Sequence, residues 1–397
     1  MFCFKFTKSY KFNVILRIFL IFALEMKKSF AEILQQVERG RLMKLQHKLP
    51  SWARVPGLVL PSDLCLEQCS SEATARYKAS LIGSPASVAD LTGGIGADCW
   101  AFSKHAEKVL YFEQNPELAA AAQSNFSRLE AGNIQVSCTR TDESVIGSLP
   151  SQDWIFLDPA RRDGAGRKVF LLEDCTPDVL TLLPAIWQKT SHLMLKLSPM
   201  ADIPLIAKRL GSELEQVHVV SSEGEVKELL CILSKGNSKP YGITVSMLES
   251  GSVLNFSPCD EQSAQSIAAD APEEGKYLHE PCAALLKAGA FRLPCTLWGL
   301  GKLAAFTHLY ISDAPLPENA SAFFKTYRII SAGQMSGAAV KSFGKAFPKA
   351  DVSARNIPMT SEQLRAKLKC APSNDGTHIF ACTAGQNRWL IAGKRVQ

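Results

Sequence analysis

The amino-acid sequence predicts an α/β fold: a mostly parallel β-sheet with helices on both faces, preceded by a helical segment and followed by small α+β domains. Three observations predict it. Short apolar strands alternate with amphipathic helices between residues 87 and 210, a pattern typical of parallel sheets. A hairpin follows the alternating region. Within that region, a glycine-rich turn joins the first strand to the first helix.

The alternating region contains five predicted strands and the helices between them. The strands are Ser87–Leu91, Lys108–Phe112, Ile134–Cys138, Asp153–Leu157 and His192–Leu197, and the helices are Ala97–His105, Pro116–Leu129, Asp174–Gln188 and Ile203–Leu210. Two further strands, Gln216–Val220 and Glu228–Leu233, have only a short turn between them, so they must pair antiparallel. The sheet is therefore expected to carry one antiparallel strand near its edge.

Changes in composition predict the domain organisation. The expected segments are 1–25, an N-terminal helical segment 26–83, the α/β domain 84–235, a linking region 241–320 and a basic domain 321–397. Residues 1–25 are interpreted as upstream sequence before a native start at Met26, with a targeting segment as the alternative. The apolar run Asn13–Leu24 is too short to span a bilayer, and no small-residue cleavage site follows it.

Outside the alternating region the expected elements are shorter and less regular. A helix capped at Ser62 is expected to run to about Leu81. After the polar linker Ser234–Pro240 we expect strands at Gly242–Leu248, Phe306–Ile311, Tyr327–Ile330 and Ala350–Arg355, helices at Leu285–Leu293, Ser336–Lys345 and Ser361–Leu368, and a hairpin of His378–Thr383 with Trp389–Gly393.

The overall composition is that of a folded protein, with 46% hydrophobic and 21% charged residues. Twelve cysteines are scattered without the spacing of a zinc site, so no metal is expected. Cys99, Cys138 and Cys231 lie in apolar runs and are expected to be buried thiols. Reduced cysteines favour a cytoplasmic location, and no membrane partner is expected.

Charge is concentrated at the C-terminal end of the chain. Residues 321–397 contain twelve Lys or Arg against three acidic residues, a net charge of +9, whereas the whole chain has +6. Such a segment suits a phosphate-rich partner, and a solvated basic face explains it equally well. The candidate phosphate-binding residues are Lys341, Lys345, Lys349, Arg355, Arg365, Lys367 and Lys369.

The glycine-rich turn Asp90-Leu-Thr92-Gly93-Gly94-Ile-Gly96 is the most informative motif. Glycines at a strand-to-helix turn let the backbone approach a ligand, and the free N–H groups of the helix face it. Acidic or polar residues follow the next strands at the same sheet edge, where open α/β sheets bind ligands. These are Glu113 and Gln114 after the second strand, Thr141 and Asp142 after the third, and Asp158-Pro159 after the fourth.

A nicotinamide cofactor is the rival interpretation of this turn. Its fingerprint needs a third glycine, and Cys99 stands at that position. An acid before the turn, Asp90, also suits a ligand with a cationic amino-acid end. Residues 87–233 resemble a class I methyltransferase, a Rossmann-like fold whose sheet also closes with a hairpin.

The resemblance implies S-adenosyl-L-methionine as the cofactor and assigns residues to it. Asp90, Thr92, Gly93, Gly94 and Gly96 match the first motif of that family. Glu113, with Gln114 beside it, matches the acid that accepts the ribose hydroxyls, and Asp142 matches the acid that meets the adenine amino group.

Asp158-Pro159-Ala160-Arg161-Arg162 resembles the fourth motif of nucleic-acid methyltransferases, which positions a target amino group. Asp158 and Pro159 match that motif, whereas Ala160 and Arg161 replace its second proline and its aromatic residue. Arg161 or Arg162 is expected to stack on a base or bind a phosphate, and surface ion pairing is the alternative.

The Asp-Pro-Ala-Arg form is also similar to that of uracil-5 RNA methyltransferases, which need a nucleophilic cysteine after the fifth strand. This chain has Leu197-Ser198-Pro199 there. Covalent carbon-5 chemistry is therefore disfavoured, and an exocyclic nitrogen, ribose or other acceptors are favoured; of these an exocyclic nitrogen is the expected target. The polar helix that contains Thr74 and Lys78 is interpreted mainly as a packing element, with cover for the cofactor as the alternative.

The whole layout resembles a bacterial methyltransferase family with a ferredoxin-like piece near 276–318 and a C-terminal THUMP-like domain. Besides the Asp158 motif, Tyr277-Leu-His279-Glu280-Pro281, interpreted as a turn with a packed histidine, and Arg355-Asn-Ile-Pro358 carry this resemblance. It implies RNA, either rRNA or tRNA, as the substrate. A methyltransferase of proteins or small molecules and a non-catalytic RNA-binding protein are the alternatives.

Overall fold

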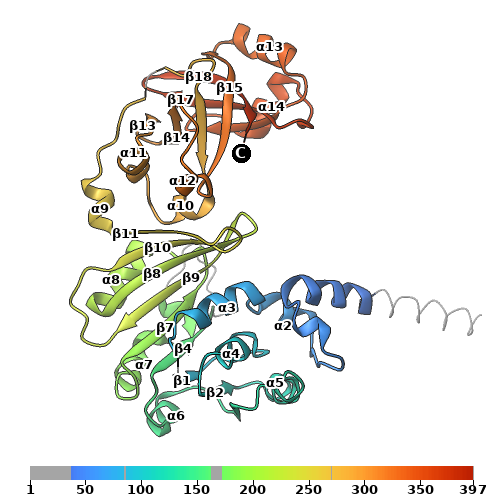
Figure 1. Ribbon diagram of the computed structural model, residues 1–397, viewed down its shortest axis with the longest axis vertical. Coiled ribbons are helices and arrows are strands. Elements are labelled where there is room, and N and C mark those ends of the chain that lie inside the picture. Colours follow the sequence, from blue (N-terminus) through green and yellow to red (C-terminus); the bar gives the residue numbers. More distant parts are fainter. Residues whose placement is uncertain (1–36, 85, 162–171, 270, 397) are drawn as a thin grey trace, which may run out of the picture. The chain divides into compact units, whose positions relative to one another are not determined.

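The computed structural model describes residues 37–84, 86–161, 172–269 and 271–396 (Figure 1). The described chain divides into two compact units. The smaller unit contains residues 37–84 and 93–139, and the larger one contains 86–92 and the described residues from 140 onward. Residues 1–25, interpreted above as upstream sequence, lie outside the described part.

The smaller unit is mainly helical. Residues 37–48 form a helix, and the elements that follow are η1 (Trp52–Arg54), α2 (Asp63–Gln68), α3 (Glu72–Ser80), α4 (Ala97–Phe102), β2 (Lys108–Glu113), α5 (Pro116–Arg128) and β3 (Ile134–Cys138). The prediction of a single helix from Ser62 to Leu81 is wrong, because the first helix ends at Gln68 and a second helix begins after Ser71. The Ser71 hydroxyl accepts the Thr74 N–H and so caps a new helix.

Parallel strands β2 and β3 and the helices packed on them form the core of the smaller unit. β2 and β3 pair from Val109 with Ile134 to Glu113 with Cys138. The buried rings of Tyr111 and Phe126 meet edge to face with centroids 5.5 Å apart. Cys138 is exposed because it is the last residue of β3, so the expectation of a buried thiol is wrong there.

The larger unit begins with the sheet that the sequence predicts. Its strands are β1 (Ser87–Asp90), β4 (Trp154–Leu157), β7 (His192–Leu197), β8 (Leu214–Ser222), β9 (Glu225–Ser234), β10 (Gly242–Met247) and β11 (Ser252–Phe256). They lie in the order β11-β10-β8-β9-β7-β4-β1. β1, β4 and β7 are parallel, which confirms the predicted α/β fold. β9 is antiparallel to both of its neighbours, as the hairpin predicts.

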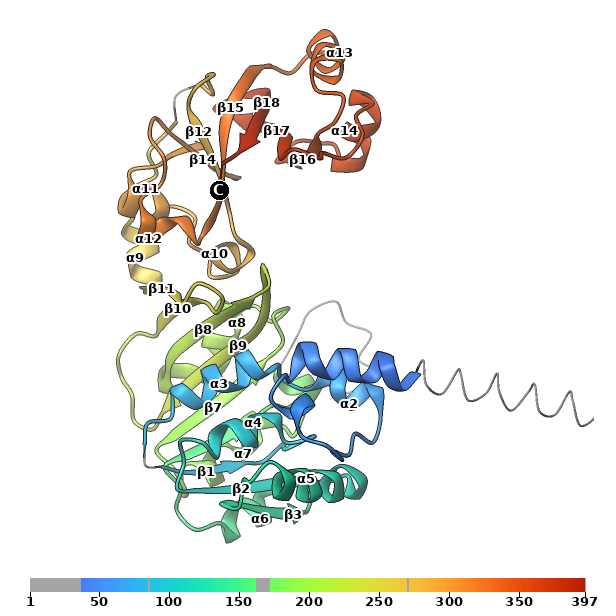
Figure 2. The same cartoon turned by 45° about the vertical axis from the view of Figure 1, so that its right-hand side comes forward.

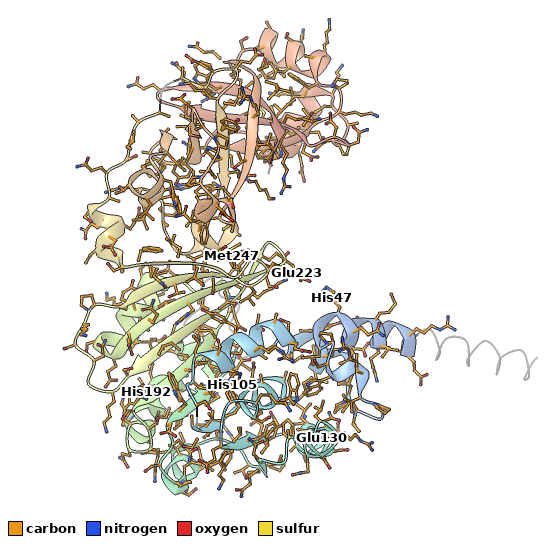
Figure 3. The ribbon with its side chains drawn as sticks, in the orientation of Figure 1. His47, His105, Glu130, His192, Glu223 and Met247 are labelled. Atoms are coloured by element: carbon orange, nitrogen blue, oxygen red, sulfur yellow. The ribbon has the colours of Figure 1, made fainter. Side chains whose placement is uncertain are left out.

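The sheet continues beyond the linker that marks the expected end of the α/β domain. β10 pairs parallel with β8, and β11 pairs antiparallel with β10. The antiparallel strand β9 therefore lies inside the sheet. Glu223, labelled in Figure 3, takes a positive φ of 56° in the turn between β8 and β9.

Three helices belong to this sheet region: α6 (Glu143–Ser148), α7 (Val179–Ile186) and α8 (Ile203–Leu210). The helix expected to begin at Asp174 begins later, because the Asp178 carboxylate accepts the Thr181 N–H and caps α7. Before it lie η2 (Leu172–Asp174), the short strand β6 (Cys175–Thr176) and its partner β5 (Ala160–Arg161). Within the described residues, no helix is both long and apolar enough to cross a lipid bilayer.

A second sheet of seven strands fills the rest of the larger unit (Figure 2). Its strands are β12 (Tyr277–Pro281), β13 (Gly301–Ala304), β14 (Thr307–Ser312), β15 (Phe324–Gln334), β16 (Asp351–Arg355), β17 (Thr377–Ala384) and β18 (Asn387–Arg395), in the order β13-β14-β12-β15-β18-β17-β16. The accompanying helices are α9 (Pro258–Ser263), α10 (Ala283–Lys287), α11 (Leu293–Trp298), α12 (Glu318–Ser321), α13 (Gly337–Ala346) and α14 (Ser361–Leu368).

Two expectations for this region are wrong. Tyr277–Pro281, interpreted as a turn, is the interior strand β12, which pairs with β14 and β15. The helix expected at Leu285–Leu293 is replaced by α10 and α11, because the positive φ of Gly289 ends the first of them. Met247 at the end of β10, labelled in Figure 3, lies 3.9 Å (Sδ to Sγ) from Cys282, the N-cap residue of α10.

Candidate active site

The glycine-rich turn requires glycine at two positions of the smaller unit. A Cβ at Gly93 would lie 2.1 Å from the Tyr111 ring. Gly96 has a φ of +90°, and a Cβ there would lie 2.3 Å from the Phe126 ring. Both glycines therefore bring the backbone into close packing with buried aromatic rings. The Tyr111 hydroxyl also donates to the Gly94 carbonyl.

Glu113, the predicted ribose acid, lies directly beside this turn. Its Oε2 accepts the Gly94 N–H at 2.9 Å, and its Oε1 accepts the Asn115 N–H at 2.8 Å. Each carboxylate oxygen has a second lone pair, so the fixed carboxylate can still accept ribose hydroxyls. Gln114 is exposed between these two partners.

A cavity of about 110 Å³ opens against the turn within the smaller unit. Its walls are the backbone of Gly93–Asp98, the residues around the break between α2 and α3, and Leu118. In that wall the Ser70 hydroxyl donates to Asp98 at 2.7 Å, and the fully buried Lys78 ammonium lies 3.1 Å from Asp98 and donates to Ser70. Lys78 therefore supports the wall of the cavity.

The residues present fit the expected cofactor in part. The open space next to Gly94, where a Cβ would meet nothing within 4 Å, and the fixed Glu113 carboxylate suit a nucleoside with vicinal hydroxyls. A volume of about 110 Å³ is smaller than the usual few hundred Å³ of a ligand site. This cavity can therefore hold only one end of S-adenosylmethionine.

In the larger unit, hydrogen bonds connect Asp90 with Asp158 through Thr92. Asp90 is 1% exposed, and its carboxylate accepts the Thr92 N–H at 2.9 Å. The Thr92 hydroxyl in turn accepts the Asp158 N–H at 2.7 Å. The ends of β1 and β4 are thereby held in register, and the predicted cofactor motif is joined to the predicted catalytic motif. Whether Asp90 also meets the cofactor stays a prediction.

The Asp158 carboxylate forms an ion pair that the sequence reasoning missed. Its Oδ2 lies 2.5 Å from Nζ of Lys196 on β7. The two side chains are 35% and 13% exposed respectively, so Asp158 remains accessible. The available signal was a lysine near the carboxyl end of the apolar strand His192–Leu197.

The other predicted residues of the two motifs occupy separate positions. Asp142 is exposed, and its carboxylate caps α6 by accepting the Val145 N–H at 2.9 Å. Pro159 is buried behind Asp158. Arg161 lies in β5, but its side chain and the whole of Arg162 are outside the described residues. Their stacking or phosphate-binding role stays a prediction.

The predicted RNA-binding residues fall into two groups. Lys341, Lys345, Lys349, Lys367 and Lys369 are exposed on or beside α13 and α14. The two helices meet where a Cβ at Gly344 would lie 2.0 Å from the Leu368 carbonyl, and Lys345 and Lys367 are the sequence neighbours of these two residues. Arg365 instead donates to the Ala350 carbonyl at 3.2 Å.

Arg355 connects the motif Arg355–Pro358 with the motif Tyr277–Pro281, because its guanidinium lies 2.7 Å from the Glu280 carboxylate. His279 is buried between the hydroxyls of Thr326, 3.1 Å from Nδ1, and Ser312, 2.8 Å from Nε2. Burial lowers the pKa of His279 to about 4. His279 is therefore a satisfied core histidine, as its sequence context predicted.

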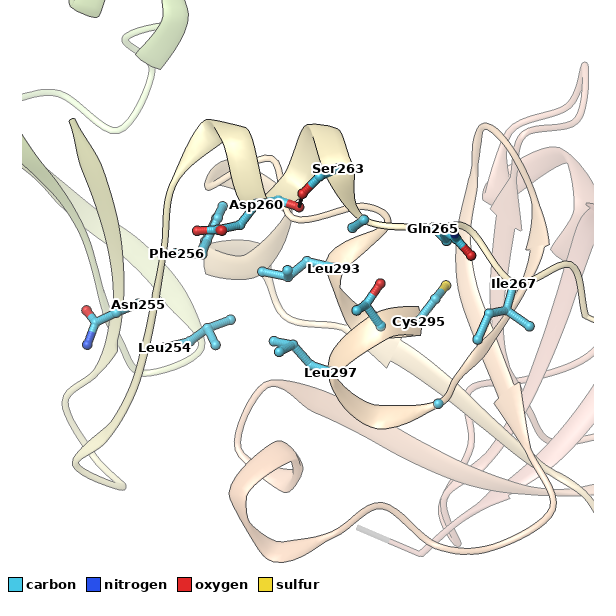
Figure 4. Close-up of a pocket in the computed structure, with 13 residues that line it drawn as sticks. Leu254, Asn255, Phe256, Asp260, Ser263, Gln265, Ile267, Leu293, Cys295 and Leu297 are labelled. Atoms are coloured by element: carbon cyan, nitrogen blue, oxygen red, sulfur yellow. Dashed lines mark hydrogen bonds between the residues drawn. The ribbon is translucent and has the colours of Figure 1, made fainter. Parts of the chain in front are cut away.

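A larger cavity of about 720 Å³ lies in the larger unit (Figure 4). β11, α9 and α11 line it with mixed apolar and polar side chains, including Phe256, Asp260 and Leu297. None of the predicted site residues borders this cavity.

Comparisons with known proteins agree with this arrangement. A ferredoxin-like domain family matches residues 277–318, and a THUMP domain-like family matches residues 324–395. The crystal structure of a putative methyltransferase from Porphyromonas gingivalis W83 is 32% identical, with a TM-score of 0.79. The match covers 90% of this chain and 88% of that one. No curated protein matches the sequence.

More distant structures match only part of the chain. An rRNA methylase from Streptococcus thermophilus is 14% identical with a TM-score of 0.31, over 41% of this chain and 93% of its own. The tRNA m1G37 methyltransferase of M. jannaschii is 14% identical with a TM-score of 0.28, over 42% of this chain and 49% of its own.

Proposed function

Because this chain belongs to the class I S-adenosylmethionine-dependent methyltransferases with a C-terminal THUMP-like domain, we propose that it methylates RNA. The observation that carries the proposal is the set of exposed lysines on or beside α13 and α14, two helices in contact, in a chain that also holds a methyltransferase fold. Lysine ammonium groups bind phosphates as point charges, so this surface suits an RNA backbone. The expected substrates are rRNA or tRNA.

S-adenosylmethionine, when bound, supplies the methyl group. The chain's own residues hold and orient the reactants: the turn Gly93–Gly96 and Glu113 bind the nucleoside, and Asp142 is proposed for the adenine amino group. Asp158, held by Thr92 and Lys196, is proposed to position the acceptor. The sequence motif around Asp158 favours an exocyclic nitrogen as the acceptor.

The experiment that tests the function is nucleoside mass spectrometry of rRNA and tRNA from a deletion strain. One methylated nucleoside should disappear and return when the gene is restored. If every methylated nucleoside persists, the RNA proposal is wrong, and a protein or small molecule becomes the expected substrate. Calorimetry with S-adenosylmethionine tests the non-catalytic alternative, because a chain that only binds RNA would give no heat.

A further inference from the structure

The ion pair between Asp158 and Lys196 changes what the site can accept. Lys196 Nζ lies 2.5 Å from Oδ2 of Asp158, at the carboxyl ends of neighbouring parallel strands. An ammonium group has only donors, and a carboxylate has only acceptors. The pair therefore offers a donor next to an acceptor, with the Lys196 side chain 13% exposed and the Asp158 side chain 35% exposed.

An exocyclic amine fits this pair poorly. It brings two N–H donors to the site and must keep its lone pair directed at the methyl group, so it needs two acceptors around it. Lys196 supplies a donor beside the Asp158 acceptor, so the side chains of this pair offer an amine only one acceptor.

A hydroxyl group matches the pair on both sides. Its single O–H can donate to the free oxygen of Asp158, and its lone pairs can accept from the Lys196 ammonium. A positive charge at this point also stabilises the negative charge that the hydroxyl oxygen gains as its proton leaves. The Lys196 side chain is therefore suited to an oxygen acceptor.

A second carboxylate lies on the same face of the sheet. Lys196 pairs directly with Leu230 on β9, and Glu228 is two residues from Leu230, so all three side chains point to one face. Glu228 is 2% exposed, which places a buried carboxyl group as a diagonal neighbour of Lys196. Lys196 therefore has a carboxyl group on each of its two neighbouring strands.

We propose that the acceptor atom is a hydroxyl oxygen, which in RNA means the ribose 2′-hydroxyl, and that Lys196 and Asp158 are the catalytic residues that contact it. The inference rests on the proposed RNA methyltransferase function. The oxygen forms its bond to the methyl carbon as the carbon–sulfur bond of the sulfonium donor breaks and the electron pair stays on sulfur. The hydroxyl proton moves to the Asp158 carboxylate and from there to water, while Lys196 stays protonated.

The test uses the full-length protein, S-adenosylmethionine with a tritiated methyl group, and total RNA from a strain that lacks the gene. The labelled RNA is digested completely with alkali. Alkaline cleavage requires a free 2′-hydroxyl, so a 2′-O-methylated residue remains in a dinucleotide, whereas base-methylated residues are released as mononucleotides. We expect the label in dinucleotides.

The outcomes separate the two proposals. Label in mononucleotides overturns the hydroxyl inference and leaves the RNA methyltransferase function standing. RNA that takes up no label, from a protein that binds the cofactor in calorimetry, contradicts the proposed function itself and the inference that rests on it.

Variants test the role of Lys196 directly. Lys196→Gln should lower the rate of transfer by about 100-fold, the usual loss for a charge-stabilising donor, with cofactor affinity within about twofold of wild type. Lys196→Arg keeps the charge and should recover part of the rate. Lys208→Gln, an exposed lysine on α8, is the matched control and should transfer at the wild-type rate. Wild-type transfer by Lys196→Gln overturns the assignment; if that variant does not fold, the alkaline digestion of wild-type product decides alone.

Discussion

At Gly96 the backbone needs both a left-handed conformation and the absence of a side chain. Its φ is +90°, and a Cβ would meet Phe126 at 2.3 Å. Gly96→Ala should therefore lower the free energy of unfolding by about 2 kcal/mol or more and weaken cofactor binding. Denaturant titration and calorimetry measure both effects. Gly147→Ala in α6, where a Cβ meets nothing within 4 Å, is the control and should be neutral or stabilising.

Asp158 is expected to act on the acceptor and not on the cofactor. Asp158→Ala removes the carboxylate but keeps the backbone N–H that donates to Thr92. Methyl transfer should fall by at least about 100-fold, while the affinity for S-adenosylmethionine stays close to that of wild type. Calorimetry beside a transfer assay checks this. A matching loss of cofactor affinity would place Asp158 among the cofactor contacts instead.

His279 makes the stability of the fold depend on pH. Its folded-state pKa is lowered to about 4 from 6.5, because burial disfavours the charged ring. The unfolded chain thus binds a proton more readily, and the stabilisation present above pH 6.5 is lost as pH falls toward 4, by up to about 3 kcal/mol. His279→Gln should be less stable at pH 7 and show a flatter pH profile between pH 7 and 4. An unchanged profile would assign the dependence to other groups.

The residues of the site were partly predictable from the sequence. Motifs identified Gly94, Glu113 and Asp158 because each follows a strand of recognisable apolar pattern. Lys196 was missed because its role comes from a partner on another strand, 38 residues away in the chain. The sequence contains no local signal for such a pair.

The ends of helices were the least predictable parts of the elements. The contribution of their capping residues to the free energy of unfolding can nevertheless be measured. Thr360 and Gln363 form a capping box at the start of α14: the Thr360 hydroxyl accepts the Gln363 N–H, and the Gln363 side chain accepts the Thr360 N–H. Thr360→Ala should cost about 1 kcal/mol of stability, measured by urea unfolding. Gln363→Ala removes one bond of the pair and should cost less. Equal stability of Thr360→Ala and wild type would contradict this role of the cap.

The strands of the first sheet agree with the sequence because parallel strands are continuously apolar and alternate with helices. β10 and β11 were harder to place, since their pairing with β8 joins segments on both sides of a polar linker. The sequence predicted α2 and α3 as one helix because the spacing of their apolar residues is continuous. Only the capping residue Ser71 separates the two helices.

At the scale of the whole molecule, charge should govern RNA affinity. Replacing Lys341, Lys345 and Lys367 with Gln removes three exposed charges near the α13–α14 contact. If each contacts one phosphate, the slope of log affinity against log salt concentration should fall by about 2 for single-stranded RNA. The control removes Lys208, Lys235 and Lys239, also exposed, and should leave the slope unchanged. Equal effects of the two triple variants would mean that binding is not localised to the C-terminal surface.

The seven-stranded sheet limits where recombination can divide this chain. The ferredoxin-like match contains β12 and β14, the THUMP-like match contains β15 and β18, and β12 pairs directly with β15 in the middle of one sheet. A recombination point between residues 318 and 324 would separate two hydrogen-bonded neighbours and leave an unpaired edge on each fragment. The two matched segments therefore form a single structural module, and a chimera that exchanges this end of the chain should exchange residues 277–395 as one piece.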